Sequence, residues 1–244
     1  MDDNVKTFLD KIQELKNVKI KVLALSLGKE IDSSSLAFKQ QKDLISTIAD
    51  GAVGALKFQK IINELIIENT GENALKVTDK LPIILKLRMD SIGDTIKFGE
   101  DEVSLQPILE KSQKLKFKQT KTIKGVVTIC LEVPTLPYES HVIQATMDIL
   151  KKDGETEIGK NIGNIYTYEI VKYIKSIKFG EQEVVFPDIP IRDRVKIVDN
   201  LPLATNKEII SFIQDIKKKE TDLLTVVVNG EEKSFDIDVR FFDS

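Results

Sequence analysis

The sequence predicts an α+β fold in which amphipathic helices are interspersed with antiparallel β-hairpins. Two observations predict it: apolar residues recur at helical spacing in several segments, and short alternating segments are joined by glycine-containing turns. At 244 residues, the chain can form one large domain or two small ones. We place a boundary between a mostly helical half with one opening strand, 1–94, and a mixed half with hairpins, 95–244, and a single domain is the alternative.

The N-terminal half is predicted to open on a helix and a strand. The helix carries apolar residues at helical spacing, namely Val5, Phe8, Leu9, Ile12 and Leu15. The segment 18–27 alternates like a strand, can accommodate a bulge and ends at Gly28.

Three helices are expected between this strand and residue 95. The serines at 33–35 should cap the first, which contains Leu44. Gly51 and Gly54 are expected to interrupt the chain before the second. The third should start near Thr78, because Pro82 is well tolerated in a first helical turn.

Two predicted hairpins of the C-terminal half have nearly the same sequence. Residues 96–103 and 177–184 differ only where Asp101 is replaced by Gln182, and a looser third copy occupies 228–232. An internal duplication would explain the likeness, but we favour convergent hairpin chemistry, because a period seen twice does not indicate a solenoid.

The remaining elements follow from the same signals. One long strand is expected over 123–133, and it is followed by an amphipathic helix, by a polar loop at 151–163 and by a helix over 166–174. Thr205 and Glu208 have the spacing of a capping box, which predicts a helix start there. The chain should close with two strands.

Phe241 and Phe242 end the last predicted strand. Neighbouring residues of a strand point to opposite faces, so we expect one ring in the core and the other exposed or covered by a partner. A closing strand that is buried on both faces is equally consistent with the pattern.

Charge and composition exclude several classes of function. The 36 basic and 39 acidic residues give a net charge of −3, so no overall field favours nucleic acid or an anionic membrane. Arginine, which binds phosphates and bases in a bidentate manner, is scarce. No apolar run approaches the roughly 18 to 20 residues that span a bilayer, and the acidic N-terminus does not resemble a signal peptide. We expect a protein of the reducing cytoplasm, with neither nucleic acid nor membrane as a partner.

No set of residues in the sequence predicts catalysis. His141 is the only histidine, and adjacent positions of a helix do not face each other, so Ser140 is not paired with it by proximity in sequence. Glu139 is also near, but a triad needs a third group that orients the base. Cys130 is the only cysteine and lies in an apolar strand, which excludes an intrachain disulfide and a structural zinc site.

Motifs that bind ions and phosphates are absent as well. Asp236 and Asp238 lie in a strand pattern and not in a calcium loop. Gly159 and Gly163 precede a helix without the Lys-Ser/Thr pair of a phosphate-binding loop. We therefore expect no enzyme activity, no cofactor and no metal.

A run of lysines surrounds Phe117. It could be an electrostatic docking face for an acidic partner, but we favour a solvated linker or an edge strand protected by lysines. The run consists of Lys111, Lys114, Lys116, Lys118, Lys121 and Lys124.

Four segments, spread over nearly the whole chain, occur in a recognisable order. An opening strand at 18–22 precedes a turn at Gly28-Lys29, and a helix begins with Phe-Lys-Gln-Gln-Lys-Asp-Leu-Ile at 38–45. The third segment is Leu-Lys-Leu-Arg-Met-Asp-Ser-Ile-Gly-Asp at 85–94. The fourth, Val-Pro-Thr-Leu at 133–136, precedes a helix, a hairpin and the Phe241-Phe242 ending. In this order the segments resemble the baseplate hub family of T-even-type myophages, whose members are hub subunits or hub assembly proteins.

The third segment is the most specific, since it resembles the family's Leu-Arg-x-Lys-Ser-Val-Gly-Glu signature. The chain departs from the family at Asp90, where the family has Lys, and at Asp94, where it has Glu. It also departs at 33–35, where the family has a more apolar approach to the helix that contains Arg.

The resemblance implies a non-enzymatic protein that helps to build the hub of a contractile phage tail. Its partners would be other hub and tail proteins, in homo- or hetero-oligomers, and it would act in the cytoplasm of the infected host or in the virion baseplate. The alternatives are an assembly chaperone that leaves the mature virion and an enzyme that depends on carboxylates. Carboxylates with shifted pKa values in a deep pocket would favour the enzyme, and an exposed apolar patch would favour binding.

Overall fold

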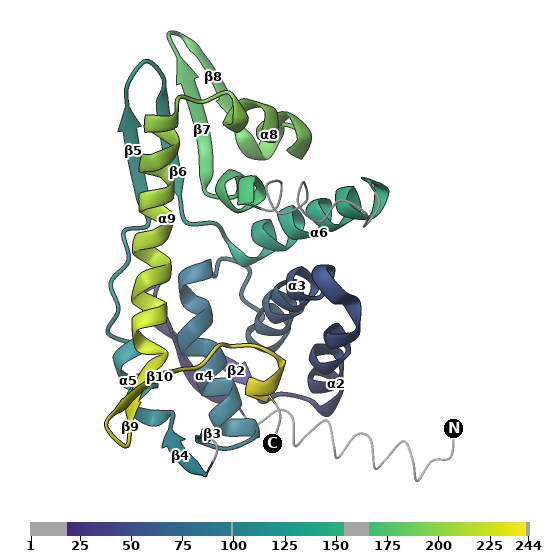
Figure 1. Cartoon of the computed structure of the whole chain (residues 1–244), viewed down its shortest axis with the longest axis vertical. Coiled ribbons are helices and arrows are strands. Elements are labelled where there is room, and N and C mark those ends of the chain that lie inside the picture. The colour runs from purple at the N-terminus through teal and green to yellow at the C-terminus, as the bar shows by residue number, and fades with distance from the viewer. Residues whose placement is uncertain (1–18, 99, 154–165, 243–244) are drawn as a thin grey trace.

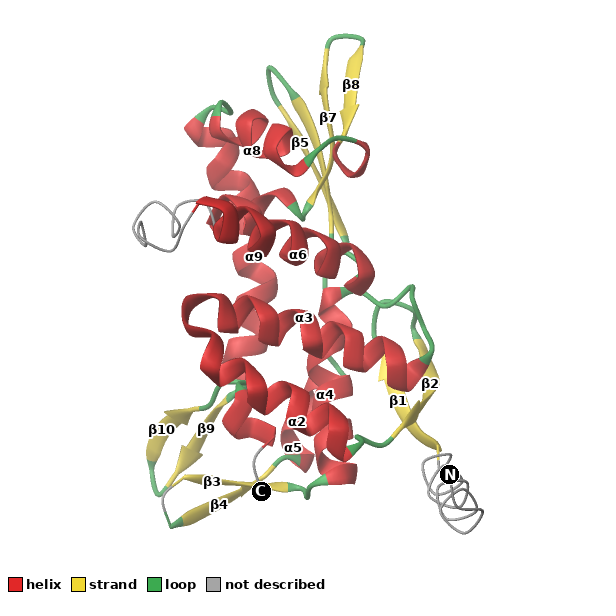
Figure 2. Ribbon diagram, turned by 90° about the vertical axis from the view of Figure 1, so that its right-hand side faces the viewer, coloured by secondary structure: helices red, strands yellow, loops and turns green. Residues whose placement is uncertain are grey.

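The computed structural model is an α+β molecule, which confirms the predicted class (Figure 1). It describes residues 19–98, 100–153 and 166–242. Helices α2, α3 and α4 pack at one end, and a four-stranded antiparallel sheet lies at the other (Figures 1 and 2). The long helix α9 (Leu203–Leu223) runs along both parts and connects them.

The described chain begins with a hairpin. Strand β1 (Lys19–Ala24) pairs with β2 (Lys29–Ser34), and Gly28 makes the turn with a φ of 63°. The serines at 33 and 34 therefore belong to a strand, and the prediction that they cap a helix is wrong. Helix α2 (Phe38–Ser46) begins after Ala37, whose N–H donates to the Oε1 atom of Gln40 at 3.0 Å.

The expected interruption after α2 is also wrong. A 3₁₀ turn, Thr47–Asp50, leads directly into α3 (Gly51–Thr70), so Gly51 starts the helix and Gly54 lies inside it. A glycine in a helix costs about 1 kcal/mol relative to alanine, and the buried apolar face of α3 outweighs that cost. Phe58, Ile62, Leu65 and Ile66 belong to that face, whereas the buried Leu56 packs against α6 (Leu136–Asp153).

Helix α4 (Lys80–Ser91) begins where the sequence predicts, after the 3₁₀ turn Val77–Asp79 and with Pro82 in its first turn. Its Arg88 is 5% exposed and attaches the C-terminal residues to the helix. The Nε atom of Arg88 donates to the carbonyl of Phe241 at 3.0 Å, and a second nitrogen donates to the carbonyl of Gly93. The segment 85–94 therefore joins parts of the chain that are far apart in the sequence.

The three predicted hairpin turns are confirmed. The hairpins pair β3 (Thr95–Phe98) with β4 (Asp101–Ser104), β7 (Ile174–Phe179) with β8 (Gln182–Val185), and β9 (Thr225–Val228) with β10 (Glu231–Ser234). The first two have the same register, with Lys97 opposite Glu102 and Lys178 opposite Glu183. In the third, Asn229 and Gly230 have φ values of 53° and 85°, as a tight hairpin turn requires.

The single strand predicted over 123–133 is two strands. β5 (Thr120–Lys124) and β6 (Thr128–Glu132) form a hairpin with its turn at 125–127. β6 also pairs with β7, with a register shift next to Cys130, so the sheet order is β5-β6-β7-β8. Val126 and Val127 of the turn are apolar and continue directly into β6, which concealed the turn.

Further helical segments lie in the second half of the chain. They are α5 (Gln106–Ser112), α6 (Leu136–Asp153), a helical stretch at 166–171, the 3₁₀ turn Phe186–Asp188, α8 (Ile191–Asp199) and α9. The stretch expected to be helical up to residue 174 ends earlier, because Ile174 starts β7. Helix α9 begins at Leu203 after Pro202, so Thr205 and Glu208 lie within it and the predicted capping box is wrong. The predicted buried stripe of this helix is confirmed, and it consists of Ile209, Phe212, Ile213 and Ile216.

The C-terminal pair of phenylalanines lies in a 3₁₀ turn, Val239–Phe242, and not in a strand. Phe241 is 5% exposed and Phe242 is 0% exposed, so the expectation that one ring faces solvent or a partner is wrong, and both rings are buried as the alternative has it. The Phe242 ring packs against the ring of Phe58 in α3, with centroids 6.3 Å apart. The chain from 235 to 238 is irregular, so Asp236 and Asp238 do not lie in a strand either.

Buried apolar residues form two main clusters. The first lies among α3, α4, α5 and the C-terminus, and it contains Leu65, Leu85, Leu105, Leu136 and Phe242. Residues from both sides of the predicted boundary at 94/95 therefore share it. The second lies between the sheet and α9, and it contains Ile129, Ile174, Phe186, Phe212 and Ile213.

Several predictions fall outside the described residues: the helix with Val5 to Leu15, most of the polar loop (154–163), and the glycines at 159 and 163. The first residues of that loop, 151–153, belong to α6. Among the residues described, no helix combines the length and the apolar character needed to cross a membrane.

We expect Phe242→Ala to lower the free energy of unfolding by about 3 to 5 kcal/mol, because it leaves a cavity in a closed core. Phe179→Ala is the matched control, since that ring is 61% exposed, and it should change stability by less than about 1 kcal/mol. Urea unfolding measures both. Equal losses would show that Phe242 is not a core residue.

Candidate functional site

A cavity of about 700 Å³ lies where α3, α4, α6, α9 and the C-terminal segment meet. Ligand sites of proteins have similar volumes, about 300 to 1,000 Å³. Its walls are largely apolar and include Ile48, Phe58, Ile62, Leu81, Ile84, Leu224, Ile237 and Val239. Charged residues that are distant in the sequence gather at one side of it.

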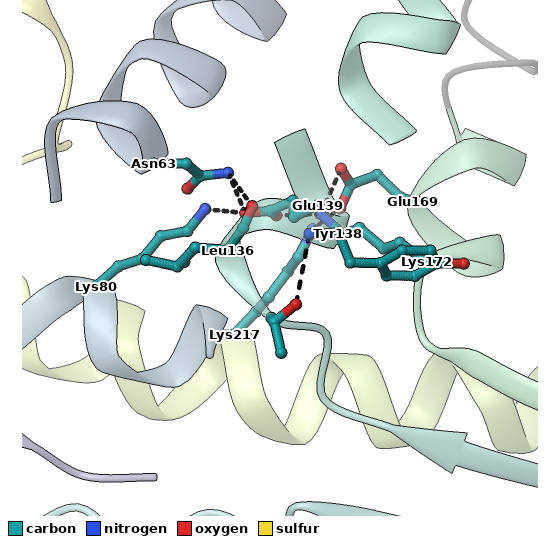
Figure 3. A network of polar contacts seen from close by, with 9 residues as sticks. Asn63, Lys80, Leu136, Tyr138, Glu139, Glu169, Lys172 and Lys217 are labelled. Atoms are coloured by element: carbon teal, nitrogen blue, oxygen red, sulfur yellow. Dashed lines mark hydrogen bonds and ion pairs between the residues drawn. The ribbon is translucent and has the colours of Figure 1, made fainter. Parts of the chain in front are cut away.

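Glu139 is the centre of this charged group (Figure 3). It lies in the first turn of α6 with its side chain 2% exposed. Its Oε1 accepts a hydrogen bond from Lys172 Nζ at 2.7 Å, and its Oε2 accepts one from Asn63 Nδ2 at 2.9 Å. Lys80, the first residue of α4, also forms an ion pair with Oε2. The carboxylate is therefore neutralised from two sides.

The group extends as a chain of alternating charges. Lys172, whose side chain is 4% exposed, also contacts Glu169 Oε1 at 2.9 Å, and Lys217 Nζ of α9 contacts Glu169 Oε2 at 3.1 Å. The order Lys80, Glu139, Lys172, Glu169, Lys217 thus links α4, α6, the segment before β7 and α9 (Figure 3). We call these five residues the ion network.

Burial and pairing act in opposite directions on the pKa values of this network. Burial alone would raise the pKa of Glu139, but Lys172 and Lys80 outweigh it and hold that pKa well below its usual range. Likewise, burial would lower the pKa of Lys172, but Glu139 and Glu169 raise it. The pKa of Glu169 is lowered, since Lys172 and Lys217 outweigh its burial. These three groups stay charged at neutral pH.

Glu220 of α9 lines the same cavity but behaves differently. Burial raises the pKa of Glu220 to about 7, and the lysines nearby only partly oppose this. Within the part of the chain that the structure describes, its buried Oε1 has no hydrogen-bond partner. Buried carboxylates are normally paired, so this atom is an exception that needs an explanation.

Three exposed apolar residues of α2 and the turn after it form a strip, and one of them lines the cavity. Phe38 and Ile45 of α2 are seven positions apart and lie on one face of the helix, 76% and 39% exposed. Ile48, in the following 3₁₀ turn, is 67% exposed and also lines the cavity. Exposed apolar patches of this kind mark interaction sites when they are contiguous.

The residues considered for catalysis are not brought together. His141 is exposed on α6, whereas Glu139 of the same helix is buried in the ion network. Cys130 is half-buried in β6. Asp238 lines the cavity but is bound to Arg240 at 2.6 Å. No group of three His, Cys, Asp or Glu side chains among the described residues could hold a metal ion.

The lysine run does not form one face. Lys111 lies in α5 and Lys124 in β5, with an irregular connection between them. Phe117, inside the run, packs against the cluster between the sheet and α9, and Lys219 Nζ lies 5.6 Å from its ring centroid.

The sequence did not indicate that Lys80, Lys172 and Glu220 belong to the candidate site. Each is an ordinary charged residue in its own segment, and the partners of Glu139 are 59 and 33 positions away. Only Glu139 could be noticed in the sequence, as a carboxylate near a helix start. A carboxylate at that position is also explained by its favourable interaction with the helix dipole.

We expect Glu139→Gln to lower the free energy of unfolding by about 3 to 5 kcal/mol, since it leaves a buried lysine incompletely paired. Lys172→Met should also be destabilising, and the double variant should lose less than the sum of the two, with a coupling of about 2 kcal/mol. Urea unfolding of the four proteins completes the cycle. As a control, Glu208→Gln removes a partner of Lys121 at 3.5 Å that is 55% exposed, and it should cost less than about 1 kcal/mol. Additive losses would contradict a direct pairing.

Glu220→Gln is expected to stabilise the protein at high pH. The folded-state pKa of about 7 lies above the ordinary 4.5, so the folded state binds more protons and stability falls as pH rises between these values. The 2.5-unit difference corresponds to about 3 kcal/mol above pH 7. Urea unfolding at pH 8 should show a gain of that order for the variant, and unfolding near pH 4 should show almost none. Equal gains at both pH values would contradict a raised pKa.

No protein-family model matches this chain, and neither a curated protein nor a solved structure matches it significantly. The geometry of the cavity and the resemblance of the four segments are therefore the basis for a functional proposal.

Proposed function

We propose that this chain is a protein-binding component of the baseplate hub of a contractile phage tail, or a factor that assembles the hub, and that it is not an enzyme. The observation that carries the binding role is the apolar-walled cavity together with the exposed strip of Phe38, Ile45 and Ile48, of which Ile48 lines the cavity. The assignment to a baseplate hub rests on the resemblance of the four segments. The most specific of them, 85–94, contains the buried Arg88.

The charges of the cavity favour binding over catalysis. Glu139 and Glu169 are ionised and paired with lysines, so neither is ready to accept or donate a proton. Complementary apolar walls and a few fixed polar groups are sufficient for recognition of a protein segment. The partners would be other hub and tail proteins, in homo- or hetero-oligomers, without nucleic acid or membrane.

Two roles fit this proposal. As a subunit, the protein would remain in the tail baseplate, and as an assembly chaperone it would act in the host cytoplasm and be absent from the virion. Mass spectrometry of purified particles distinguishes them.

A carboxylate-dependent enzyme is the second candidate, and Glu220 is the observation that favours it. A carboxyl group with a pKa of about 7 in a cavity is suited to general acid–base catalysis. However, no group of three His, Cys, Asp or Glu side chains that could hold a metal ion accompanies it among the described residues. Turnover of a small molecule that is lost in Glu220→Gln would favour this candidate over the first.

A nonsense mutation in the gene for this chain tests the main proposal in the phage that carries it. We expect infected cells to accumulate heads and free tail proteins but few complete baseplates, as seen by sedimentation and electron microscopy. Expression of the chain from a plasmid should restore tails. Normal numbers of complete tails without the chain would contradict the proposal.

A further inference from the structure

One carboxyl group of the cavity forms no ion pair with any described residue. The lysines of the cavity are held by two carboxylates: Lys80 and Lys172 by Glu139, and Lys172 and Lys217 by Glu169. Asp238 is bound to Arg240, and Asp236 is exposed to solvent. Glu220 is left, with one oxygen that accepts no hydrogen bond from any described residue.

The geometry of α9 makes this arrangement unexpected. Lys217 and Glu220 are three positions apart, a spacing at which opposite charges on a helix can pair. Lys217 instead contacts Glu169 at 3.1 Å. The lysine at the pairing position of the helix is thus engaged elsewhere, and a cation from outside the chain would supply the counter-charge that Glu220 lacks.

The rest of the cavity restricts what can carry that cation. Its apolar walls require an apolar body next to the charge. The carboxyl group of Glu220, which forms no ion pair with a described residue, suits the compact ammonium of lysine, whose long stem is apolar. A guanidinium has five donors, and most of them would stay unsatisfied against apolar walls. Among basic side chains, lysine therefore fits best.

We propose that the cavity binds a lysine side chain that a partner protein presents between apolar residues, with Glu220 as its counter-ion. This inference rests on the proposed protein-binding function and names the chemistry of the segment that the cavity recognises. The exposed strip of Phe38, Ile45 and Ile48 would receive the apolar neighbours of that lysine.

The binding should depend on pH through Glu220. Charged and titratable groups that face it come from every element around the cavity, namely Lys80, Glu139, Glu169, Lys172, Tyr173, Lys217, Asp236 and Asp238. Pairing lowers the pKa values of Glu139 and Glu169 and raises that of Lys172, so these three keep their charges near neutrality. Glu220, with a pKa of about 7, is mostly protonated at pH 6 and mostly ionised at pH 8.

Two peptides test the proposal with the full chain: acetyl-Leu-Lys-Leu-amide, and the same peptide with norleucine, which has nearly the same stem without the charge. Titrations followed by NMR at pH 8 should give a dissociation constant at least about tenfold lower for the lysine peptide, as expected for a partly desolvated charge pair. The preference should disappear in Glu220→Gln and persist in Glu183→Gln, an exposed glutamate of β8. At pH 6 the preference for the lysine peptide should be about tenfold weaker in the wild type and in Glu183→Gln, because both retain Glu220.

Equal affinity for the two peptides, or a lysine preference that survives Glu220→Gln, would overturn the proposal. Hexylammonium provides a further arm: if it binds through Glu220 and the lysine peptide does not, the cavity takes small amines and the partner assignment is wrong. These outcomes are independent of the nonsense-mutation experiment. Intact baseplates without this chain would overturn the hub assignment but leave the lysine site standing.

Discussion

The structure depends on how it neutralises a carboxylate and an ammonium that have been removed from water. Glu139 and Lys172 are 2% and 4% exposed in their side chains, and isolated charges in such places are costly. Their pairing requires α6 and the segment before β7 to lie together, Lys80 adds α4, and Lys217 adds α9 through Glu169. The ion network thus sets the positions of elements from both apolar clusters, and the cavity lies beside it.

Local patterns were sufficient for the fold class, most helices and all three hairpin turns, because periodicity and turn chemistry are properties of short segments. They failed where tertiary packing decides. Gly51 and Gly54 are helical since α3 is held by its buried face, and Phe242 is enclosed because Arg88 fixes the carbonyl of the residue before it. The site could not be predicted, since Glu220 and the ion network acquire their properties only from neighbours that are distant in the sequence.

The repeated hairpin sequence shows the same difference between what short segments decide and what tertiary packing decides. Residues 96–103 and 177–184 adopt the same register, so the local sequence decides the turn and the pairing. However, β3 and β4 form a sheet of their own, whereas β7 continues into a four-stranded sheet through β6. Phe98 packs edge to face against Phe235 at 6.1 Å, and the equivalent Phe179 is 61% exposed. Nearly identical short sequences thus acquire different surroundings, which limits what the repeat says about ancestry or function.

Glu220 lies beside the ion network but is not paired as its members are, and this difference links stability to function. The lysines of the ion network are paired with the carboxylates of that network. A glutamine in place of Glu220 would avoid the free-energy cost of ionising a buried carboxyl group at neutral pH. Natural proteins tolerate such local costs mainly where a site needs the group for binding or chemistry. Urea unfolding of Glu220→Gln measures the cost to stability, and the peptide titrations measure the contribution of Glu220 to binding. If ionised Glu220 destabilises the free protein and a lysine from a partner neutralises it, binding removes that destabilisation. The free energy of binding to the partner then becomes more favourable by the same amount.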